Sequence, residues 1–381
     1  MRKYTKAYRK KLLFLITEDW YFWSHRLPIA RAARDAGFEV FVATRVNQYK
    51  DFINKEGFTL VPIGLKRKGK NIIKEILCII EIIRIYRREK PDIVHHVAVK
   101  PILYGSLAAK ATGIPLVVNA LAGLGSIFIK HGWKEKIFRR LVVFAYRSAF
   151  SAKNTMGIFQ NPEDLRLFFD EGIVKGEKAV LIRGSGVDIS HFISFSEPKG
   201  IPMIVFASRM LWDKGVDEFV NAIRQIKKDG VKCRAVLVGA PDLENPTSIP
   251  EDTLRQWHTE GIVEWWGRRD DMPKVLSKSN IVALPTYREG LPKILLEAAS
   301  CGRAIVATDV PGCREIVRHN ENGLLIPPHD SKALADALKT LIEDTELRAR
   351  MGAMGREIVR AEFSEEIVVK KTMELYKKIL R

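Results

Sequence analysis

The chain has 381 residues, a charged fraction of 28% and a mean hydropathy of −0.07. These values are typical of a globular protein of two or three domains and exclude a disordered, collagen-like or multi-span membrane chain. The net charge is +18, with 35 Lys and Arg against 18 Asp and Glu in residues 1–200 but 28 against 27 in residues 201–381. A basic half of this kind predicts an anionic partner, namely nucleic acid, acidic lipid or a phosphorylated substrate. The four cysteines form no CxxC pair, which favours reduced cytosolic thiols over a metal site.

Short apolar segments alternate with amphipathic ones along the chain. The predicted strands are 12–16, 39–44, 92–97, 115–120, 156–159 and 179–184 in the first half, and 203–208, 234–240, 262–267, 281–285, 303–309 and 323–327 in the second. The clearest predicted helices are 71–89, 214–229, 331–343 and 364–380. Continuously apolar strands that alternate with helices predict parallel sheets with both faces covered. We therefore expect an α/β fold of two Rossmann-like, doubly wound domains whose strand ends face a cleft.

The predicted boundary lies in the segment 192–202, where Pro198, Gly200 and Pro202 interrupt the pattern and the excess of positive charge ends. The expected domains are 1–198 and 199–362, and the last helix, 363–381, is expected to cross back to the first domain. The uncharged stretch 111–129 is as long as a membrane span. Because Pro115 and several glycines interrupt it, it predicts a strand followed by a glycine-rich loop.

The segment YREGLPKILLE, residues 287–297, follows a predicted strand and leads into a helix. Pro292 suits the first helical turn, and Gly290 allows a ligand close to the backbone. Amides at the start of a helix bind anions, so the predicted anion site comprises Gly290, Leu291 and Lys293. Glu289 precedes the helix and Glu297 lies on it. The alternative is that both glutamates are solvated helix charges.

Arg209 and Lys214 flank the segment that follows predicted strand 203–208. A guanidinium offers a planar fork for phosphate oxygens and an ammonium offers a point charge. The pair suits a leaving nucleoside diphosphate, whose negative charge grows during transfer. Two surface charges beside a helix start are the alternative.

Weaker candidates lie in the first half. His96 ends the predicted strand 92–97 and is a candidate catalytic group, because the pKa of histidine lies near neutrality; a packed strand-end histidine is the alternative. Gly123 and Gly125 form a GxG loop that either cradles phosphate or makes a plain turn. His25, in the first strand-to-helix loop, and Lys100 are candidates for contact with an acceptor.

These motifs resemble glycosyltransferase family 4, the retaining enzymes with the two-domain GT-B fold. The resemblance rests on the pair Arg209 and Lys214, on the spacing from Glu289 to Glu297, and on SCGRAIVATDVPGCREIV at 300–317. It extends over essentially the whole chain and is strong in the C-terminal half. The first strand-to-helix loop departs from the Gly-Gly phosphate loop of many members.

The resemblance implies roles for these residues. Arg209 and Lys214 would hold the donor diphosphate, Glu289 the donor sugar and Glu297 the ribose, while the nucleobase would lie near Arg268. It also implies retention at the anomeric carbon, with the leaving phosphate assisting attack on the same face. No metal and no cofactor beyond the UDP-sugar donor substrate are expected.

The sequence around these motifs is similar to that of bacterial enzymes that extend undecaprenyl-diphosphate-linked sugars, including N-acetylgalactosaminyltransferases. The expected function is transfer of an N-acetylhexosamine from a UDP-sugar to a polyprenyl-diphosphate-linked saccharide. Domain 1–198 would bind the acceptor and domain 199–362 the nucleotide-sugar. Three basic clusters, within 2–11, 66–74 and 130–140, predict contact with an anionic membrane, hence a cytoplasmic enzyme peripheral to the inner face of the bacterial membrane. A solvated charged face, or recognition of a diphosphate without lipid contact, is the alternative for these clusters. The alternatives are a same-fold transferase with another acceptor, a non-hydrolysing nucleotide-sugar epimerase or, more remotely, a nucleic-acid-binding protein.

Overall fold

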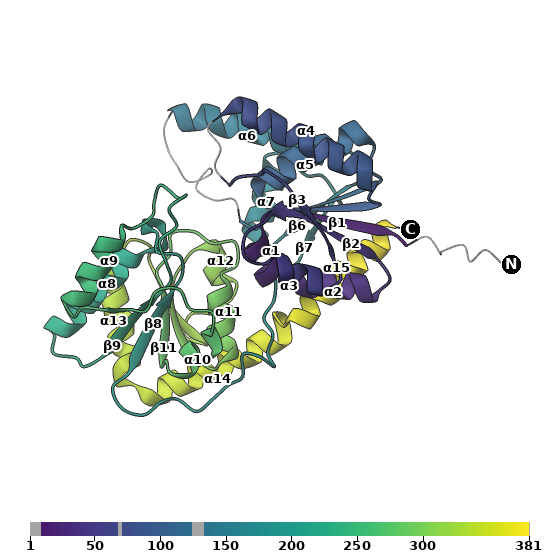
Figure 1. Cartoon of the computed structure of the whole chain (residues 1–381). Coiled ribbons are helices and arrows are strands. Elements are labelled where there is room, and N and C mark those ends of the chain that lie inside the picture. Colours follow the sequence, from purple (N-terminus) through teal and green to yellow (C-terminus); the bar gives the residue numbers. More distant parts are fainter. Residues whose placement is uncertain (1–8, 68–70, 124–132, 381) are drawn as a thin grey trace. The chain divides into compact units, whose positions relative to one another are not determined.

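A computed structural model describes residues 9–67, 71–123 and 133–380 of the chain (Figure 1). The chain divides into two compact units. Unit 1 comprises Met1–Ser185 together with Val369–Arg381, and unit 2 comprises Gly186–Val368. Each unit is built around its own parallel β-sheet with helices packed on it.

Unit 1 contains a seven-stranded sheet in the order β3-β2-β1-β4-β5-β6-β7, with every pair parallel. Its strands are β1 (Lys11–Glu18), β2 (Glu39–Arg45), β3 (Thr59–Pro62), β4 (Ile93–Val97), β5 (Leu116–Ala120), β6 (Thr155–Phe159) and β7 (Ala179–Leu181). Its helices are α1 (Asp19–His25), α2 (Leu27–Asp35), α3 (Lys50–Lys55), α4 (Ile72–Glu89), α5 (Val99–Thr112), α6 (Trp133–Phe150) and α7 (Pro162–Asp170). The sequence analysis missed β3, because this four-residue edge strand ends in a proline and has only one buried residue.

Unit 2 contains a six-stranded parallel sheet in the order β10-β9-β8-β11-β12-β13. Its strands are β8 (Met203–Ala207), β9 (Arg234–Val238), β10 (Glu264–Trp265), β11 (Ile281–Leu284), β12 (Ala304–Thr308) and β13 (Gly323–Ile326). Its helices are the 3-10 turn η2 (Trp212–Lys214), α8 (Val216–Lys228), α9 (Glu251–Thr259), α10 (Met272–Ser277), α11 (Lys293–Ser300), α12 (Pro311–Arg314), α13 (Ser331–Glu343) and α14 (Thr345–Glu362). β8 and β11 are neighbours although distant in sequence, so their following loops emerge together at the point where the strand order reverses.

The prediction of two doubly wound α/β domains is confirmed. Every residue of β8, β11 and β12 is buried, as expected for strands with helices on both faces. The first unit ends before the proline-rich segment that marked the boundary in the sequence. Val187 explains this difference, because it exchanges backbone hydrogen bonds with Phe363 (3.1 Å) and Glu365 (3.0 Å) of unit 2. Packing, rather than composition, therefore assigns residues 186–198 to unit 2.

The last helix, α15 (Glu365–Ile379), begins in unit 2, and its residues from Val369 onwards belong to unit 1. Within unit 1, the Tyr376 hydroxyl hydrogen-bonds Nδ1 of His95, and both side chains are buried. Buried polar groups of this kind are costly to leave unpaired, so this contact fixes the end of α15 on β4. Within the described part of the chain, no helix is long and apolar enough to cross a membrane.

Candidate functional site

The centre of the candidate site in unit 2 is an ion pair between Lys214 and Glu289. Lys214 ends the 3-10 turn after β8, and Glu289 lies in the loop after β11. The Lys214 ammonium donates to Oε1 of Glu289. Both side chains are mostly covered, with 15% and 19% of their surfaces exposed. The structure therefore brings together two predicted site residues that are 75 positions apart.

Two glycines allow these loops to approach each other. Gly215 has φ +74°, and a Cβ there would lie 2.0 Å from the Pro285 carbonyl oxygen. Gly312, at the start of α12, leaves space for the backbone of residues 289 and 290, because a Cβ would lie 2.6 Å from the Glu289 carbonyl oxygen. A side chain at either position would push the loops apart. The sequence analysis singled out neither glycine.

Arg209 lies beside this centre in the chain but pairs with a different acid. Its Nη1 donates to Oδ2 of Asp242 over 2.7 Å, and 43% of its side chain is exposed. Asp242 follows β9, so the pair joins the loops after two neighbouring strands. Arg209 thus pairs with Asp242 and Lys214 with Glu289, so the predicted cation pair is two separately anchored cations.

Helix α11 starts directly after this loop, with Pro292 as its N-cap. The positive end of its dipole lies close to Glu289 in sequence. Glu297 lies further along α11 and is 9% exposed. Burial raises the pKa of its carboxyl to about 7, although the Lys293 ammonium, 3.7 Å away, opposes that change. A carboxyl poised near neutrality can either accept or donate a hydrogen bond at physiological pH.

The turn after β10, the expected position of a nucleobase, is tied to the end of β9. The Gly239 N–H donates to the Gly267 carbonyl over 2.8 Å, and the Trp266 N–H donates to the Leu237 carbonyl over 2.9 Å. Arg268 follows this turn, and its guanidinium lies 3.3 Å from Asp270. Arg268 thus follows β10 at the same carboxyl end of the sheet as Arg209, which follows β8.

A supporting cluster that the sequence analysis missed holds the start of the Glu289 loop. The Tyr287 hydroxyl donates to Oε1 of Glu218 over 2.6 Å, and the Tyr287 ring lies 3.7 Å from the ring of His329. Burial, followed by the hydrogen bond to Glu218, raises the pKa of Tyr287. The Tyr287 N–H also donates to the Asp213 carbonyl over 3.1 Å. The sequence carries no periodic signal for these contacts, because they join residues from three separate segments.

His96, the catalytic candidate in unit 1, is a core residue. It has no exposed surface, and its ring nitrogens lie 2.8 Å from the Tyr86 hydroxyl and 2.8 Å from Oδ1 of Asn119. A Cβ at Gly105 would lie 2.5 Å from its Nε2, so α5 packs directly onto the ring. Burial lowers the pKa of His96 to about 4. This geometry brings His96 to no ligand, and we propose no catalytic role for it.

The other predicted residues of unit 1 are placed as follows. Lys100 bonds both carboxylate oxygens of Glu75, at 2.9 and 3.0 Å, and the Lys66 carbonyl at 3.0 Å, so it ties α4 and the loop before it to α5. His25 stacks on Tyr21 at 4.1 Å and contacts the Ser24 hydroxyl. Gly123 has φ +105°, as a tight turn requires. Gly125 lies outside the described residues, as do residues 2–8, 68–70 and 130 of the basic clusters.

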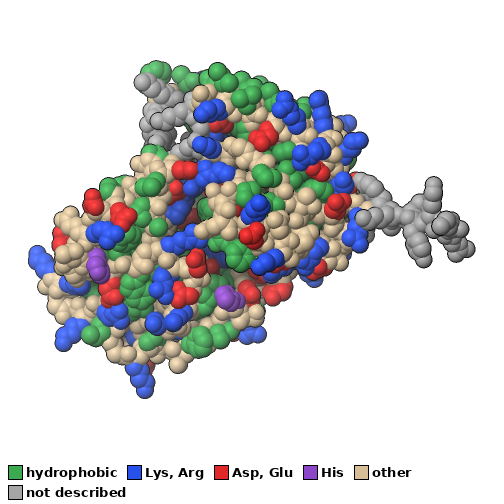
Figure 2. Space-filling view, viewed as in Figure 1, with side chains coloured by type: hydrophobic (Ala, Val, Ile, Leu, Met, Phe, Trp, Pro, Cys, Tyr) green, Lys and Arg blue, Asp and Glu red, His purple; other side chains and the backbone are tan. Residues whose placement is uncertain are grey.

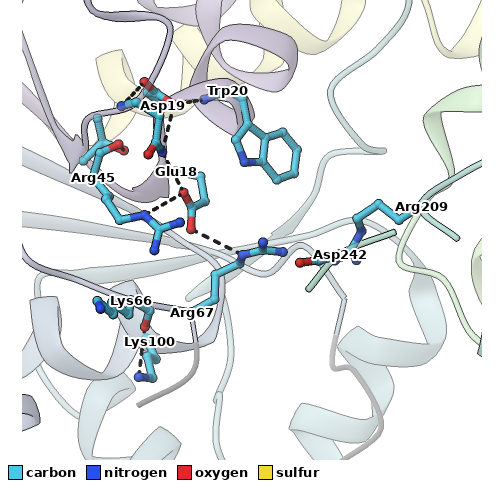
Figure 3. A network of polar contacts seen from close by, with 11 residues as sticks. Glu18, Asp19, Trp20, Arg45, Lys66, Arg67, Lys100, Arg209 and Asp242 are labelled. Atoms are coloured by element: carbon cyan, nitrogen blue, oxygen red, sulfur yellow. Dashed lines mark hydrogen bonds and ion pairs between the residues drawn. The ribbon is translucent and has the colours of Figure 1, made fainter. Parts of the chain in front are cut away.

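The carboxyl end of β1 carries a second missed group of charged residues (Figure 3). Glu18 is 2% exposed and Asp19 is completely buried. Glu18 lies between Arg45, at 3.2 Å, and Arg67, at 3.3 Å. In the sequence, Glu18 and Asp19 only mark the end of an apolar run. In the structure they are the buried acids of a polar network that includes Arg45 and Arg67.

Two cations, a carboxylate and a helix start, at the point where the strand order of a parallel sheet reverses, are typical of α/β proteins that bind nucleotides. The family comparisons specify it further. Residues 11–153 match the model described as "Glycosyl transferase 4-like", and residues 201–344 match "Glycosyl transferases group 1". The chain belongs to this glycosyltransferase family and is an enzyme with the GT-B fold.

Curated relatives agree with this assignment. The chain is 28% identical over 369 residues to the N,N'-diacetylbacillosaminyl-diphospho-undecaprenol alpha-1,3-N-acetylgalactosaminyltransferase of Campylobacter jejuni, covering 93% of this chain and 95% of that protein. It is 26% identical to the UDP-Gal:alpha-D-GlcNAc-diphosphoundecaprenol alpha-1,3-galactosyltransferase of Escherichia coli, covering 72% of both. Among solved structures, sucrose-phosphate synthase of Thermosynechococcus elongatus superposes with a TM-score of 0.81 over 98% of this chain and 99% of that chain, at 18% identity. HepE of Anabaena in complex with UDP and glucose gives 0.78 over 97% and 100%, also at 18% identity. These structures share the fold.

Proposed function

We propose that the enzyme transfers an N-acetylhexosamine, N-acetylgalactosamine in particular, from a UDP-sugar to a polyprenyl-diphosphate-linked saccharide with retention of anomeric configuration. The printed names of the Campylobacter and Escherichia relatives, which both contain a diphospho-undecaprenol-linked sugar, support the acceptor class. The single observation that carries the proposal is the Lys214–Glu289 pair at the start of α11. It sets a cation and a carboxylate side by side, where a diphosphate and a sugar hydroxyl would each find a partner.

The charges of this site suit the departure of a nucleoside diphosphate. The bond between the anomeric carbon and the phosphate oxygen breaks, and its electron pair stays on the diphosphate. Lys214, Arg209 and the first amides of α11 would stabilise that growing charge. The acceptor oxygen forms the new bond on the same face, and its proton passes to the leaving phosphate oxygen. Atoms and charge balance without a covalent sugar–enzyme bond.

Glu289 and Glu297 would orient the donor. A carboxylate only accepts hydrogen bonds, so Glu289 suits sugar hydroxyls once its partner Lys214 turns to phosphate. Glu297 would accept from the ribose hydroxyls. Because hydroxyl donors favour the ionised carboxylate, they would lower the raised pKa of Glu297 on binding.

The direct test is transfer of sugar to a lipid-linked acceptor. Wild-type enzyme, Glu289→Gln and the control Glu251→Gln are each mixed with a panel of labelled UDP-sugars, and transfer to the organic-extractable acceptor is counted. Glu251 is an exposed glutamate of α9 whose partner is Arg255, one turn away. We expect an α-linked product from the wild type and the control, and a loss of at least about a hundredfold in Glu289→Gln. Wild-type turnover in Glu289→Gln would remove Glu289 from the site, and a β-linked product would refute retention.

We also propose that unit 1 binds an anionic membrane through a surface that we call the α4–α6 face. Helices α4 and α6 both contact α5, and each exposes large apolar side chains. These are Ile72, Ile73, Ile76, Leu77 and Ile80 of α4, and Trp133, Ile137, Phe138, Leu141 and Phe144 of α6. Their exposed fractions run from 37% to 77%, and Figure 2 shows hydrophobic side chains gathered along this edge. An apolar patch this extensive marks an interaction surface.

The charge next to the α4–α6 face favours lipid over protein as its partner. A hollow of about 620 Å³ on α6 is lined by Lys136, Arg139, Arg140 and Arg147 together with Phe144. The same hollow contains a single acid, Glu171, which pairs with Arg139. Apolar residues flanked by cations are typical of surfaces that dip into anionic headgroups, where each cation contributes about 1 kcal/mol.

Vesicle sedimentation tests this partner. The double variant Leu141→Ser with Phe144→Ser is compared with Leu243→Ser, which removes an apolar side chain that is 95% exposed in unit 2. We expect the double variant to bind phosphatidylglycerol vesicles at least tenfold more weakly, because each apolar side chain buried in the membrane contributes on the order of 1.5–3 kcal/mol. The control should bind as the wild type does. Equal binding by all three proteins would refute a role for the α4–α6 face.

A further inference from the structure

The two acids at the end of β1 hold two arginine-bearing loops in place. Oδ2 of Asp19 accepts the backbone N–H groups of Asn47, at 2.6 Å, and Tyr49, at 3.1 Å. The Asn47 side chain in turn donates to Oε2 of Glu18 over 3.2 Å. The loop after β2 is therefore pinned to the end of β1, and Arg45, the last residue of β2, is placed against Glu18.

The second loop, after β3, is fixed from the other side. Lys100 of α5 donates to the Lys66 carbonyl while it pairs with Glu75 of α4. The next residue, Arg67, then extends over the Trp20 ring, with its guanidinium carbon 5.9 Å from the ring centroid, and its Nε reaches Oε1 of Glu18. Each oxygen of the Glu18 carboxylate thus faces one guanidinium (Figure 3).

The acids and the arginines at the end of β1 differ in their exposure to solvent. Glu18 and Asp19 are 2% and 0% exposed, whereas the side chains of Arg45 and Arg67 are 25% and 29% exposed. The acids lie underneath, and the partly exposed arginine side chains cover them. Buried ion pairs contribute little net stability, because desolvation offsets the attraction between the charges. Holding the two loops together therefore does not by itself account for four charged side chains here, because their ion pairs add little to the free energy of unfolding.

We propose that Arg45 and Arg67 form a binding site for a phosphate or diphosphate group, and that its occupant is the diphosphate of the acceptor. That the occupant is the acceptor diphosphate rests on the proposed function. That the site binds a phosphate or diphosphate group rests on the two arginines alone. Both guanidinium groups contact Glu18 through Nε, and both side chains remain partly exposed. Such paired forks match phosphate oxygens better than ammonium groups do. Glu18 acts as a positioning residue that fixes the separation of the two forks.

The test uses Arg45→Gln, Arg67→Gln and Arg67→Lys in the full chain. Arg31→Gln is the matched control, because Arg31 also pairs with a glutamate of unit 1, Glu56, but lies on helix α2. The first readout is calorimetric titration with inorganic pyrophosphate, which needs no turnover. The second is the KM for a short-chain, water-soluble polyprenyl-diphosphate-linked sugar, with the Kd for UDP measured beside it.

We expect each Gln variant to weaken pyrophosphate binding and to raise the acceptor KM about tenfold or more, with kcat nearly unchanged, because a contact made equally in the ground and transition states is lost. Arg67→Lys should fall between, and the UDP Kd and the control should stay at wild-type values. Unchanged KM and pyrophosphate binding would show that the pairs only hold the loops, and would overturn the proposal. Unchanged KM with lost binding to anionic vesicles would overturn the diphosphate in favour of a lipid headgroup. Absence of transfer by the wild type would instead refute the proposed function and leave the pyrophosphate result standing.

Discussion

The buried carboxyl of Glu297 makes stability depend on pH in an unusual direction. Its pKa of about 7 lies above the ordinary 4.5, because burial disfavours the charged form. Between these two values the folded protein binds more protons than the unfolded chain, so the free energy of unfolding falls as the pH rises. At 1.36 kcal/mol per unit, a separation of this size amounts to about 3 kcal/mol. This loss of stability is absent at pH values below 4.5, the pKa in the unfolded chain, and is complete above about pH 7.

The substitution Glu297→Gln removes this titration and retains the shape of the side chain. Urea unfolding of the wild type and the variant is measured from about pH 5 to about pH 8.5, where every other group is shared by the two proteins. We expect the variant to gain stability relative to the wild type as the pH rises, by up to about 3 kcal/mol. UDP should also bind the wild type more tightly as the pH rises, since ribose hydroxyls favour the ionised carboxylate. Parallel stability curves would refute the raised pKa.

Three further predictions concern the backbone and the buried histidines. Gly215→Ala should lower the free energy of unfolding by about 2 kcal/mol more than Gly230→Ala and weaken UDP binding; both positions have positive φ, but only a Cβ at Gly215 meets another backbone, so equal losses would contradict the clash. His96→Leu should lower the melting temperature by leaving buried polar partners unpaired, while the Kd for UDP stays unchanged; a loss of turnover without a loss of stability would restore a catalytic role. Because burial lowers the pKa of His95 and His96 below 6.5, their contribution to stability should decline as the pH falls below that value, which acid titration followed by circular dichroism would measure.

The sequence predicted the fold well because its signal is local. Each of the twelve predicted strands is present. Most of them are buried on both faces, and such a strand is a continuous apolar run that can be recognised in isolation. The edge strand β3 was missed because it has four residues, ends in a proline and has only one buried residue. The predicted domain boundary lies after the observed one for a similar reason. The hydrogen bonds between Val187 and residues 363 and 365 assign this segment to unit 2, and local composition carries no signal of them.

The candidate site was only partly predictable. Lys214 and Glu289 stood out because each follows a buried strand, and the strand order joins them. Glu18 and Arg45 did not stand out, and Arg67 was noticed only as part of a basic cluster. The three residues come from separate segments that meet at the carboxyl ends of β1, β2 and β3, and the sequence alone does not show that they meet. The sequence left both interpretations of His96 open, because a histidine at a strand end looks the same in sequence whether it faces solvent or, as here, the helix that packs on the strand.

The central claim is that unit 2 holds the diphosphate of the donor through Lys214 and the start of α11. A structure of the enzyme in complex with UDP tests it most directly. We expect a phosphate oxygen within hydrogen-bond distance of the Lys214 ammonium and of the amides at residues 291–293, with the ribose hydroxyls at Glu297. UDP bound elsewhere, with the Lys214–Glu289 pair untouched, would contradict the account.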